Sequence, residues 1–148
     1  MLSQIESELL LDMDKEFEDK SSIQIKSERT KIQKKILSIH SKDEFILDID
    51  RNSINLSKIK YQSRHKRTNT ILLRIDTAGG GRHLNPDGEF IPCPHIHIYK
   101  EGYGDKWAYP LDENIFTDPS NPSQLLQDFL TYFNVKKIPV IMSLGSLI

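Results

Sequence analysis

The sequence has a single cysteine among its 148 residues, so it cannot form an internal disulfide, and this is typical of proteins from reducing compartments. It also lacks any apolar run that approaches the roughly 20 residues needed to cross a bilayer. Residues 1–20 are acidic, whereas a signal peptide begins with basic residues and continues with an apolar stretch. We therefore expect a cytoplasmic protein that does not associate with a membrane.

The chain also lacks a strong charge of one sign, since its formal net charge is -1. Acidic residues gather in 6–19 and basic residues in 58–67. Such runs are most often solvated surface, and the alternative is a basic strip that contacts phosphates. Aromatic residues are few, and the strip contains only Tyr61, so stacking of nucleic-acid bases has little support.

Internal repeats, low-complexity segments and clear linkers are absent as well. Hydrophobic residues make up 37% of the chain and charged residues 28%, which is typical of a globular protein. The length suits one domain with a real core. We expect residues 1–148 to form a single domain.

The first part of the chain has apolar residues at helical spacing. Residues 2–18 are predicted to form one helix, with Leu2, Ile5, Leu9 and Met13 along its buried face. Residues 28–40 are predicted to form a second helix, because three isoleucines recur in it at spacings of three and four. Ser27 is a suitable N-cap for this second helix.

The pattern then changes to the alternation that is typical of strands. Strands are predicted at 45–49, 54–61, 69–76, 95–99 and 106–111. Within 54–61 the apolar residues change parity, which indicates a bulge. A helix follows with Asn121 as N-cap and Pro122 as its first residue. The apolar residues 138–148 form either a last strand or a cover on the core.

Together these patterns predict an α+β fold with two N-terminal helices, an antiparallel sheet of about five strands, and one C-terminal helix packed on the sheet.

Two histidines stand two residues apart within the expected strand 95–99, so their side chains leave the same face. If this strand pairs with strand 69–76, the isoleucines of both strands must face the core. The opposite face then carries a polar patch from the two strands. The patch consists of Arg74, Asp76, His95, His97 and Tyr99. The glycine-rich loop 79–83 ends close by and brings Arg82 and His83 towards it.

One interpretation of this patch is cleavage of RNA without a metal ion. One of the histidines removes the proton of the ribose 2′-hydroxyl, and another histidine or Tyr99 protonates the leaving oxygen. Asp76 orients a histidine, and cations stabilise the phosphorane charge. The candidate cations are Arg74, Arg82 and Lys100. Histidine suits this chemistry because its neutral and charged forms coexist near pH 7.

Two other interpretations stay open. In one, His95 and His97 bind a divalent metal ion together with His83 or Asp76, although the H-x-H spacing is only weakly specific. In the other, the histidines form a polar face that is structural or binds a partner.

The remaining motifs are weak. The run at 79–82 has three glycines but lacks the spacing and the Lys-Ser/Thr pair of a P-loop, so it indicates a turn rather than a nucleotide site. Cys93 precedes the histidine strand and is better explained as a small thiol at the rim or in the core than as a nucleophile.

Arg74-Ile75-Asp76, then His83, then Pro94-His95-Ile96-His97 resembles the R-x-D … H … P-x-H-x-H pattern of TumE-like toxins from prokaryotic toxin–antitoxin pairs. The segment also resembles uncharacterised small bacterial and phage proteins with an NPDG … HxHxY … EGYGDKWA stretch. The resemblance covers residues 74–111. Thr77 departs from it, because the toxin pattern has Asn after the Asp.

The resemblance implies a small intracellular toxin that acts on RNA and has a cognate antitoxin as its partner. We expect a metal-independent endoribonuclease with His95 and His97 as acid and base and no cofactor. The alternatives are a phage- or mobile-element-encoded inhibitor that binds a host defence protein without catalysis, and a metal-dependent hydrolase with an H-x-H site.

Overall fold

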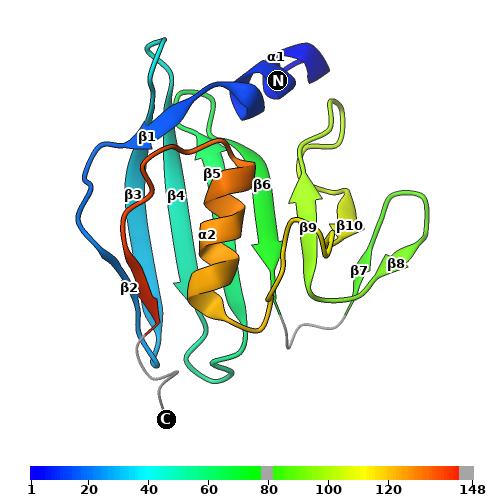
Figure 1. The fold of residues 1–148 in the computed structure, drawn as a ribbon. Helices are drawn as coiled ribbons and strands as arrows, with labels where there is room; N and C mark the ends of the chain where they lie inside the picture. Colours follow the sequence, from blue (N-terminus) through cyan, green and yellow to red (C-terminus); the bar gives the residue numbers. More distant parts are fainter. Residues whose placement is uncertain (78–81, 144–148) are drawn as a thin grey trace.

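A seven-stranded sheet organises the part of the chain that the structure, a computed structural model, describes, namely residues 1–77 and 82–143. Its neighbouring strands are all antiparallel and follow the order β1-β3-β4-β5-β6-β9-β10 (Figure 1). These strands are β1 (Lys15–Phe17), β3 (Thr30–Ser38), β4 (Glu44–Arg51), β5 (Ile59–His65), β6 (Thr70–Asp76), β9 (His95–Ile98) and β10 (Ala108–Pro110).

Two short strand pairs and two helices complete the described elements. Strand β2 (Ile23–Ile25) runs parallel to β11 (Ile141–Ser143), and β7 (His83–Leu84) forms a hairpin with β8 (Phe90–Ile91). The helices are α1 (Gln4–Asp12) and α2 (Pro122–Tyr132). The expected arrangement of two N-terminal helices over about five strands is therefore wrong, since one short helix precedes a larger sheet.

The predicted helix at 28–40 is a strand, β3, hydrogen-bonded to β1 on one side and β4 on the other. Ile32 and Ile36 are four residues apart, a spacing that fits both a helix face and a strand face. Ile39, which completed the helical stripe, lies outside β3 and is 42% exposed. β-Branched residues favour the pleated, half-buried surface, and two partner strands fix the choice.

The predicted helix at 2–18 is real but shorter, because α1 ends at Asp12 and β1 follows. Ser3 and Glu6 form a capping box at its start. The predicted buried face is also wrong in part: Ile5 and Leu9 are 71% and 62% exposed, whereas Leu10 is buried.

Lys15, the first residue of β1, stabilises the point at which the chain leaves α1. Its fully buried ammonium donates to the carbonyl oxygens of Leu11, Met13 and Phe133 at 2.8–2.9 Å. It also lies 4.0 Å from the ring centre of Phe133. The side chain thus joins the end of α1 to the end of α2.

The predicted strand at 54–61 begins only at Ile59. Ile54 is 96% exposed in the connection before β5. The change of register expected there occurs later instead, between Ser63 and Arg64, where Leu72 of β6 has no Cα partner on β5.

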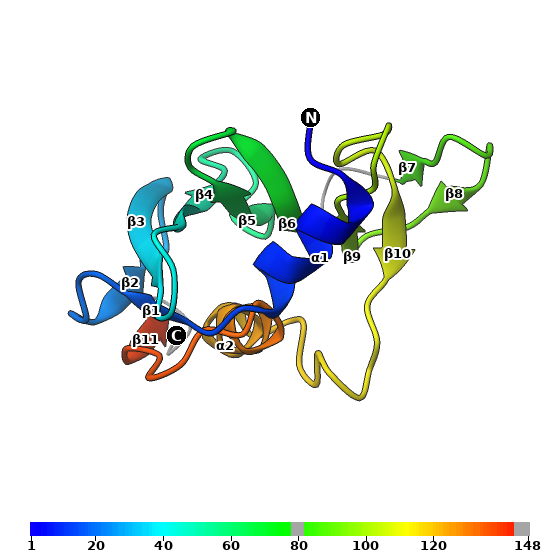
Figure 2. The ribbon, with the colours of Figure 1, turned by 90° about the horizontal axis from the view of Figure 1, so that it is seen from above.

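The C-terminal helix is confirmed. Asn121 caps α2 by accepting from the backbone N–H of Gln124, and Pro122 starts the helix. The helix lies against one face of the sheet in both ribbon views (Figures 1 and 2), and its buried side chains belong to the core. These side chains are Leu125, Leu126, Phe129 and Leu130. Of the tail, residues 141–143 form β11, and 144–148 lie outside the described residues.

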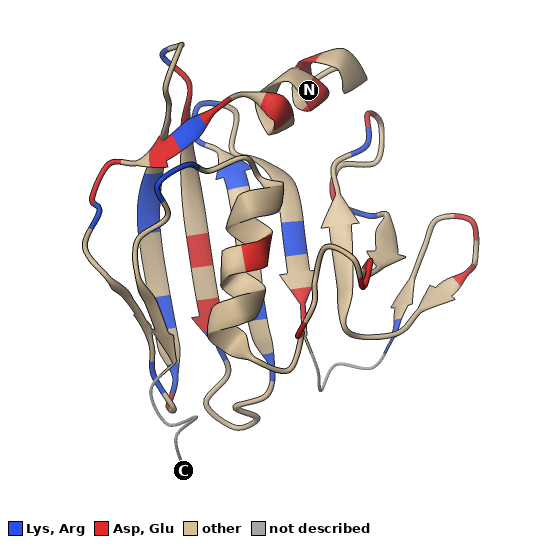
Figure 3. Cartoon of the chain, in the orientation of Figure 1, with Lys and Arg blue, Asp and Glu red and all other residues tan. Residues whose placement is uncertain are grey.

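Strand pairing leaves the opposite face of the sheet polar. Along one row, Asp50 of β4 is opposite Lys60 of β5, which is opposite Asp76 of β6, and Asp76 is opposite His95 of β9. In Figure 3 the sign of the charged positions changes from strand to strand, with Lys on β3, mainly Asp and Glu on β4, and Lys and Arg on β5. Among the described residues, no helix is long and apolar enough to span a bilayer.

Candidate functional site

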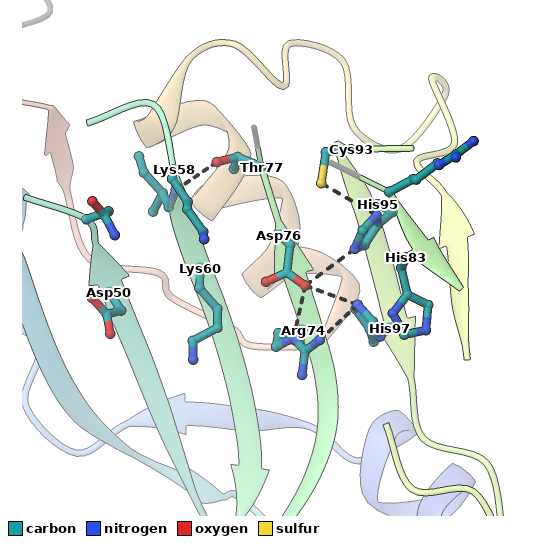
Figure 4. A pocket seen from close by; sticks show the side chains of 13 residues that line it. Asp50, Lys58, Lys60, Arg74, Asp76, Thr77, His83, Cys93, His95 and His97 are labelled. Atoms are coloured by element: carbon teal, nitrogen blue, oxygen red, sulfur yellow. Dashed lines mark hydrogen bonds and ion pairs between the residues drawn. The ribbon is translucent and has the colours of Figure 1, made fainter. Parts of the chain in front are cut away.

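A pocket of about 370 Å³ lies on this polar face, at the ends of β5, β6 and β9 (Figure 4). Its charged, imidazole and thiol lining residues are Asp50, Lys58, Lys60, Arg74, Asp76, Arg82, His83, Cys93, His95 and His97. The histidines are therefore not covered by α2, which packs on the other face.

The pairing of β6 with β9 builds the floor of the pocket. Ile75 is opposite Ile96 towards the core, as predicted, and this alternation directs the neighbouring side chains into the pocket. Arg74 is opposite His97, and Asp76 is opposite His95. The expected patch is thus formed by direct cross-strand neighbours.

Asp76 is the centre of this patch. One carboxylate oxygen, Oδ2, lies 3.0 Å from Nε2 of His97, 3.4 Å from Nε2 of His95 and 3.1 Å from Nε of Arg74. Burial raises the pKa of Asp76, but the contacts with the two histidines and the charge of Arg74 lower it by more. The carboxylate is therefore ionised throughout the neutral range.

Backbone carbonyls fix the protonation pattern of three imidazoles. Nδ1 of His97 lies 2.8 Å from the carbonyl oxygen of Asp105, and Nδ1 of His95 lies 3.1 Å from that of Pro92. For His83 the nitrogen is Nε2, 2.7 Å from the carbonyl oxygen of Lys106. A carbonyl oxygen only accepts, so each of these nitrogens carries the hydrogen. In a neutral ring the other nitrogen then has a free lone pair.

Asp105 supports the site twice. Its backbone oxygen holds His97, and its side chain forms an ion pair with Arg74. Arg74 in turn donates from Nη2 to Nε2 of His97 at 2.9 Å. The residue pattern did not indicate this role of Asp105, because the contact with His97 is made by the backbone and could come from any residue type.

The hairpin β7–β8 brings His83 over the other two histidines. Its ring centre lies 4.7 Å from that of His97 and 5.9 Å from that of His95. Asn85 anchors the hairpin by a pair of 2.9 Å hydrogen bonds with the backbone of Ala108 in β10. A turn follows Asn85, in which the N–H of Gly88 donates to the Asn85 carbonyl.

Two predicted site residues lie elsewhere. Tyr99 packs in the core and donates its hydroxyl hydrogen to the carbonyl oxygen of Leu2, because β9 ends at Ile98 and no longer alternates there. Lys100 is exposed and stacks over the ring of Trp107, with its Nζ 4.6 Å from the ring centre. Neither of the two lines the pocket.

The rim holds further predicted and unpredicted residues. The guanidinium of Arg82 stacks 4.1 Å from the ring centre of Phe90 and edges the pocket, while the glycines at 79–81 lie outside the described residues. Cys93 is a half-buried rim thiol, with Sγ 3.7 Å from Nδ1 of His95. Lys58 and Lys60 join the rim from β5 and its preceding turn, and the basic strip in the sequence was the signal for them.

Asp76, His95 and His97 are the described residues whose donor atoms could hold a metal ion, since all these atoms lie within 4.8 Å of one another. His83, which the sequence offered as a third ligand, is outside this set. Aspartate, the other third ligand considered, takes its place.

Comparison with known proteins gives a family but no function. The chain matches a family of unknown function, DUF6978, over residues 2–135, and it therefore belongs to this family. The match includes all residues of the pocket. Neither a curated protein nor a solved structure matches the chain.

Proposed function

We propose that this DUF6978 protein cleaves phosphodiester bonds of RNA in the histidine pocket and acts as a toxin in the cytoplasm. The observation that carries the proposal is that residues of one sequence pattern, which lie far apart along the chain, come together in one pocket. The charged residues and the histidines of the R-x-D … H … P-x-H-x-H pattern line the same pocket. They are Arg74, Asp76, His83, His95 and His97.

The rim supplies positive charge for a phosphate group. Lys58, Lys60 and Arg82 edge the pocket, and no ion pair within the described residues engages their charged groups. Cations placed around a phosphoryl group stabilise the charge that develops on its oxygens during displacement. Arg74 is less available, because Asp76 and Asp105 already share its guanidinium.

His83 is the histidine best arranged for proton transfer. It is half-buried at the pocket wall, and its Nδ1 is free to accept a proton because Nε2–H donates to Lys106. His95 and His97 are 4% and 1% exposed, and their free nitrogens face Asp76. We therefore assign the base to His83, and a positioning role to the other two in this step.

The reaction is an internal transfer at phosphorus. Nδ1 of His83 takes the proton of the ribose 2′-hydroxyl, and the 2′-oxygen forms a bond to phosphorus. The bond from phosphorus to the 5′-oxygen breaks, and that oxygen takes a proton from a water molecule in the open pocket. The products are a 2′,3′-cyclic phosphate and a 5′-hydroxyl end.

The test uses the full-length protein with an RNA oligonucleotide and its all-deoxy counterpart. We expect cleavage of the RNA alone, with cyclic phosphate ends. His83→Asn should slow it by about 100-fold or more, the usual contribution of a general base. His40→Asn, which changes an exposed histidine outside the pocket, is the matched control. Intact RNA, or equal rates for wild type and His83→Asn, would refute the assignment.

A second function, inhibition of a host protein by binding alone, is favoured by a different observation. Ile5 and Leu9 lie one helical turn apart on α1 and are both largely exposed. The same variant separates the two functions in cells. Growth arrest that persists in His83→Asn but is lost in Ile5→Ser/Leu9→Ser would indicate inhibition by binding to a host protein.

A further inference from the structure

The floor of the pocket presents its donor atoms in an unusual way. Nδ1–H of both His95 and His97 is used by a backbone carbonyl, so in the neutral rings both Nε2 lone pairs point at Oδ2 of Asp76. These three atoms converge on one point of the pocket floor, where all of them lie within 4.8 Å of one another.

The two imidazoles are also shielded from solvent. Their ring centres are 4.8 Å apart, and His95 and His97 are 4% and 1% exposed. Imidazole nitrogens together with a carboxylate oxygen form a donor set that transition metals accept.

Arg74 contacts two of the three atoms. It donates to Oδ2 of Asp76 and to Nε2 of His97. Nε2 of His95 has no hydrogen-bond donor within the described part of the chain, and its polar neighbour is Asp76 at 3.4 Å. A cation at this point would contact all three atoms, which Arg74 does not.

From these contacts we infer that Asp76, His95 and His97 bind one divalent transition-metal ion, with Nε2, Nε2 and a carboxylate oxygen as ligands. The inference rests on the proposed function only in placing the ion at the floor of the same pocket. Hydrogen bonds from metal-bound histidines to backbone carbonyls are the usual way of fixing such ligands.

The distances fit this assignment. Around a tetrahedral ion with bonds of about 2.1 Å, neighbouring ligand atoms are about 3.4 Å apart. The separations from Asp76 to His95 and His97 are 3.4 and 3.0 Å, and all three donor atoms lie within 4.8 Å. The ion would replace Arg74 as the positive partner of Asp76 and His97. Arg74 would keep its ion pair with Asp105.

The donor set also selects the class of metal. Two imidazole nitrogens and one carboxylate oxygen suit zinc, iron, cobalt or nickel, whereas Mg²⁺ and Ca²⁺ prefer oxygen ligands. Three protein ligands leave a coordination position open, which is the arrangement of catalytic rather than structural zinc sites. Lys58, Lys60 and Arg82 line the same pocket as the three ligands.

The experiment is a titration of the full-length, chelator-treated and dialysed protein with Zn²⁺, Co²⁺ and Mg²⁺. Calorimetry should give one Zn²⁺ per chain, and Co²⁺ should develop the visible absorption of a nitrogen-ligated site. Asp76→Asn and His95→Ala should each weaken Zn²⁺ binding by about 100-fold or more, since even changes outside the ligand shell cost 10–100-fold. His40→Gln should bind as wild type does.

The wild-type titration decides the matter even if a variant does not fold. Absence of a one-per-chain Zn²⁺ site, or Mg²⁺ binding of equal strength, overturns the inference, as does unchanged binding in folded Asp76→Asn. RNA cleavage by a protein that shows no such Zn²⁺ site would overturn the inference while leaving the proposed function intact. One tightly bound Zn²⁺ without RNA cleavage would do the reverse.

Discussion

Replacing Asp76 by alanine should destabilise the fold, because this carboxylate is the counter-ion of a buried network. Asp76→Ala leaves Arg74 with Asp105 as its remaining carboxylate partner and removes the neighbour of both Nε2 atoms. Removing one partner of a buried pair costs about 3–5 kcal/mol. The Asp76 side chain is 28% exposed, so we expect the lower part of that range, about 3 kcal/mol.

Asparagine at position 76 tests the effect of the charge of the side chain separately from the effect of its size. Asp76→Asn keeps the size of the side chain, and its amide N–H can donate to a free Nε2 of His95 or His97. It still removes the counter-ion of Arg74. We therefore expect a loss of only about 1 kcal/mol, smaller than that for alanine.

The contribution of Asp76 to the free energy of unfolding should fall as the pH is lowered. The pKa of Asp76 in the folded state lies below its ordinary value, so the folded state binds this proton less readily than the unfolded state. The stabilisation from Asp76 is complete above about pH 5 and is lost as the pH falls below about 4. In Asp76→Ala this part of the acid sensitivity should be missing.

The assay is urea unfolding of chelator-treated protein at pH 7 and at about pH 2.5, with His40→Asn as a control for the loss of an exposed side chain. The midpoint and slope give the free energy of unfolding for each variant. A loss of under about 0.5 kcal/mol for Asp76→Ala at pH 7, the range of surface substitutions, would refute the network. A wild type and Asp76→Ala that lose equal stability between pH 7 and about pH 2.5 would refute the sign.

Three further perturbations follow from particular contacts. Lys15→Met should lower the free energy of unfolding at pH 7 by about 2 kcal/mol, because three carbonyl oxygens lose their donor. Burial lowers the pKa of Lys15 to about 7, so the free energy of unfolding of the wild type should rise between about pH 7 and pH 10. That of Lys15→Met should rise less over the same range. Arg74→Gln should bind Zn²⁺ more tightly than wild type in the same calorimetric titration, because the guanidinium competes for two of the ligands. Asn85→Ala should release the hairpin that carries His83 and lower the rate of RNA cleavage about 10-fold. Its urea unfolding midpoint should change less than that of Asp76→Ala. An unchanged cleavage rate would show that the hairpin anchor is not needed.

The sequence was informative where apolar and polar residues alternate. In 73–76 and 95–98 every second residue is apolar, and the core needs both sets, so the strand pairing and the polar face followed together. Ile71 has the same parity as Ile75, but the register shift beside it places Leu72 in the core instead. The sequence misled at 28–40, where Ile32 and Ile36 are compatible with either period. Only the presence of β1 and β4 on both sides decides for a strand, and that is a long-range property.

Long-range structure also explains why Tyr99 was wrongly predicted to lie on the polar face. Its place two residues after His97 predicted the same face, but parity holds only while a strand lasts. Strand β9 ends at Ile98, next to the position where Leu72 interrupts the pairing of β5 and β6. Tyr99 still bonds to the Leu72 carbonyl through its backbone, yet its ring enters the core. A one-residue irregularity thus removes an otherwise sound candidate from the site.

What turns the histidines into a directional site is invisible in the residue pattern. The carbonyls of Pro92, Asp105 and Lys106 each occupy one ring nitrogen, and any residue type could have supplied them. Their positions decide that the free nitrogens of His95 and His97 point at Asp76, while His83 keeps its free nitrogen on the side opposite its backbone bond. A sequence with the same H-x-H spacing but different turns would present these nitrogens to solvent. The spacing alone is therefore a weak signal, and the turns that precede and follow β9 determine whether its histidines can converge on a cation.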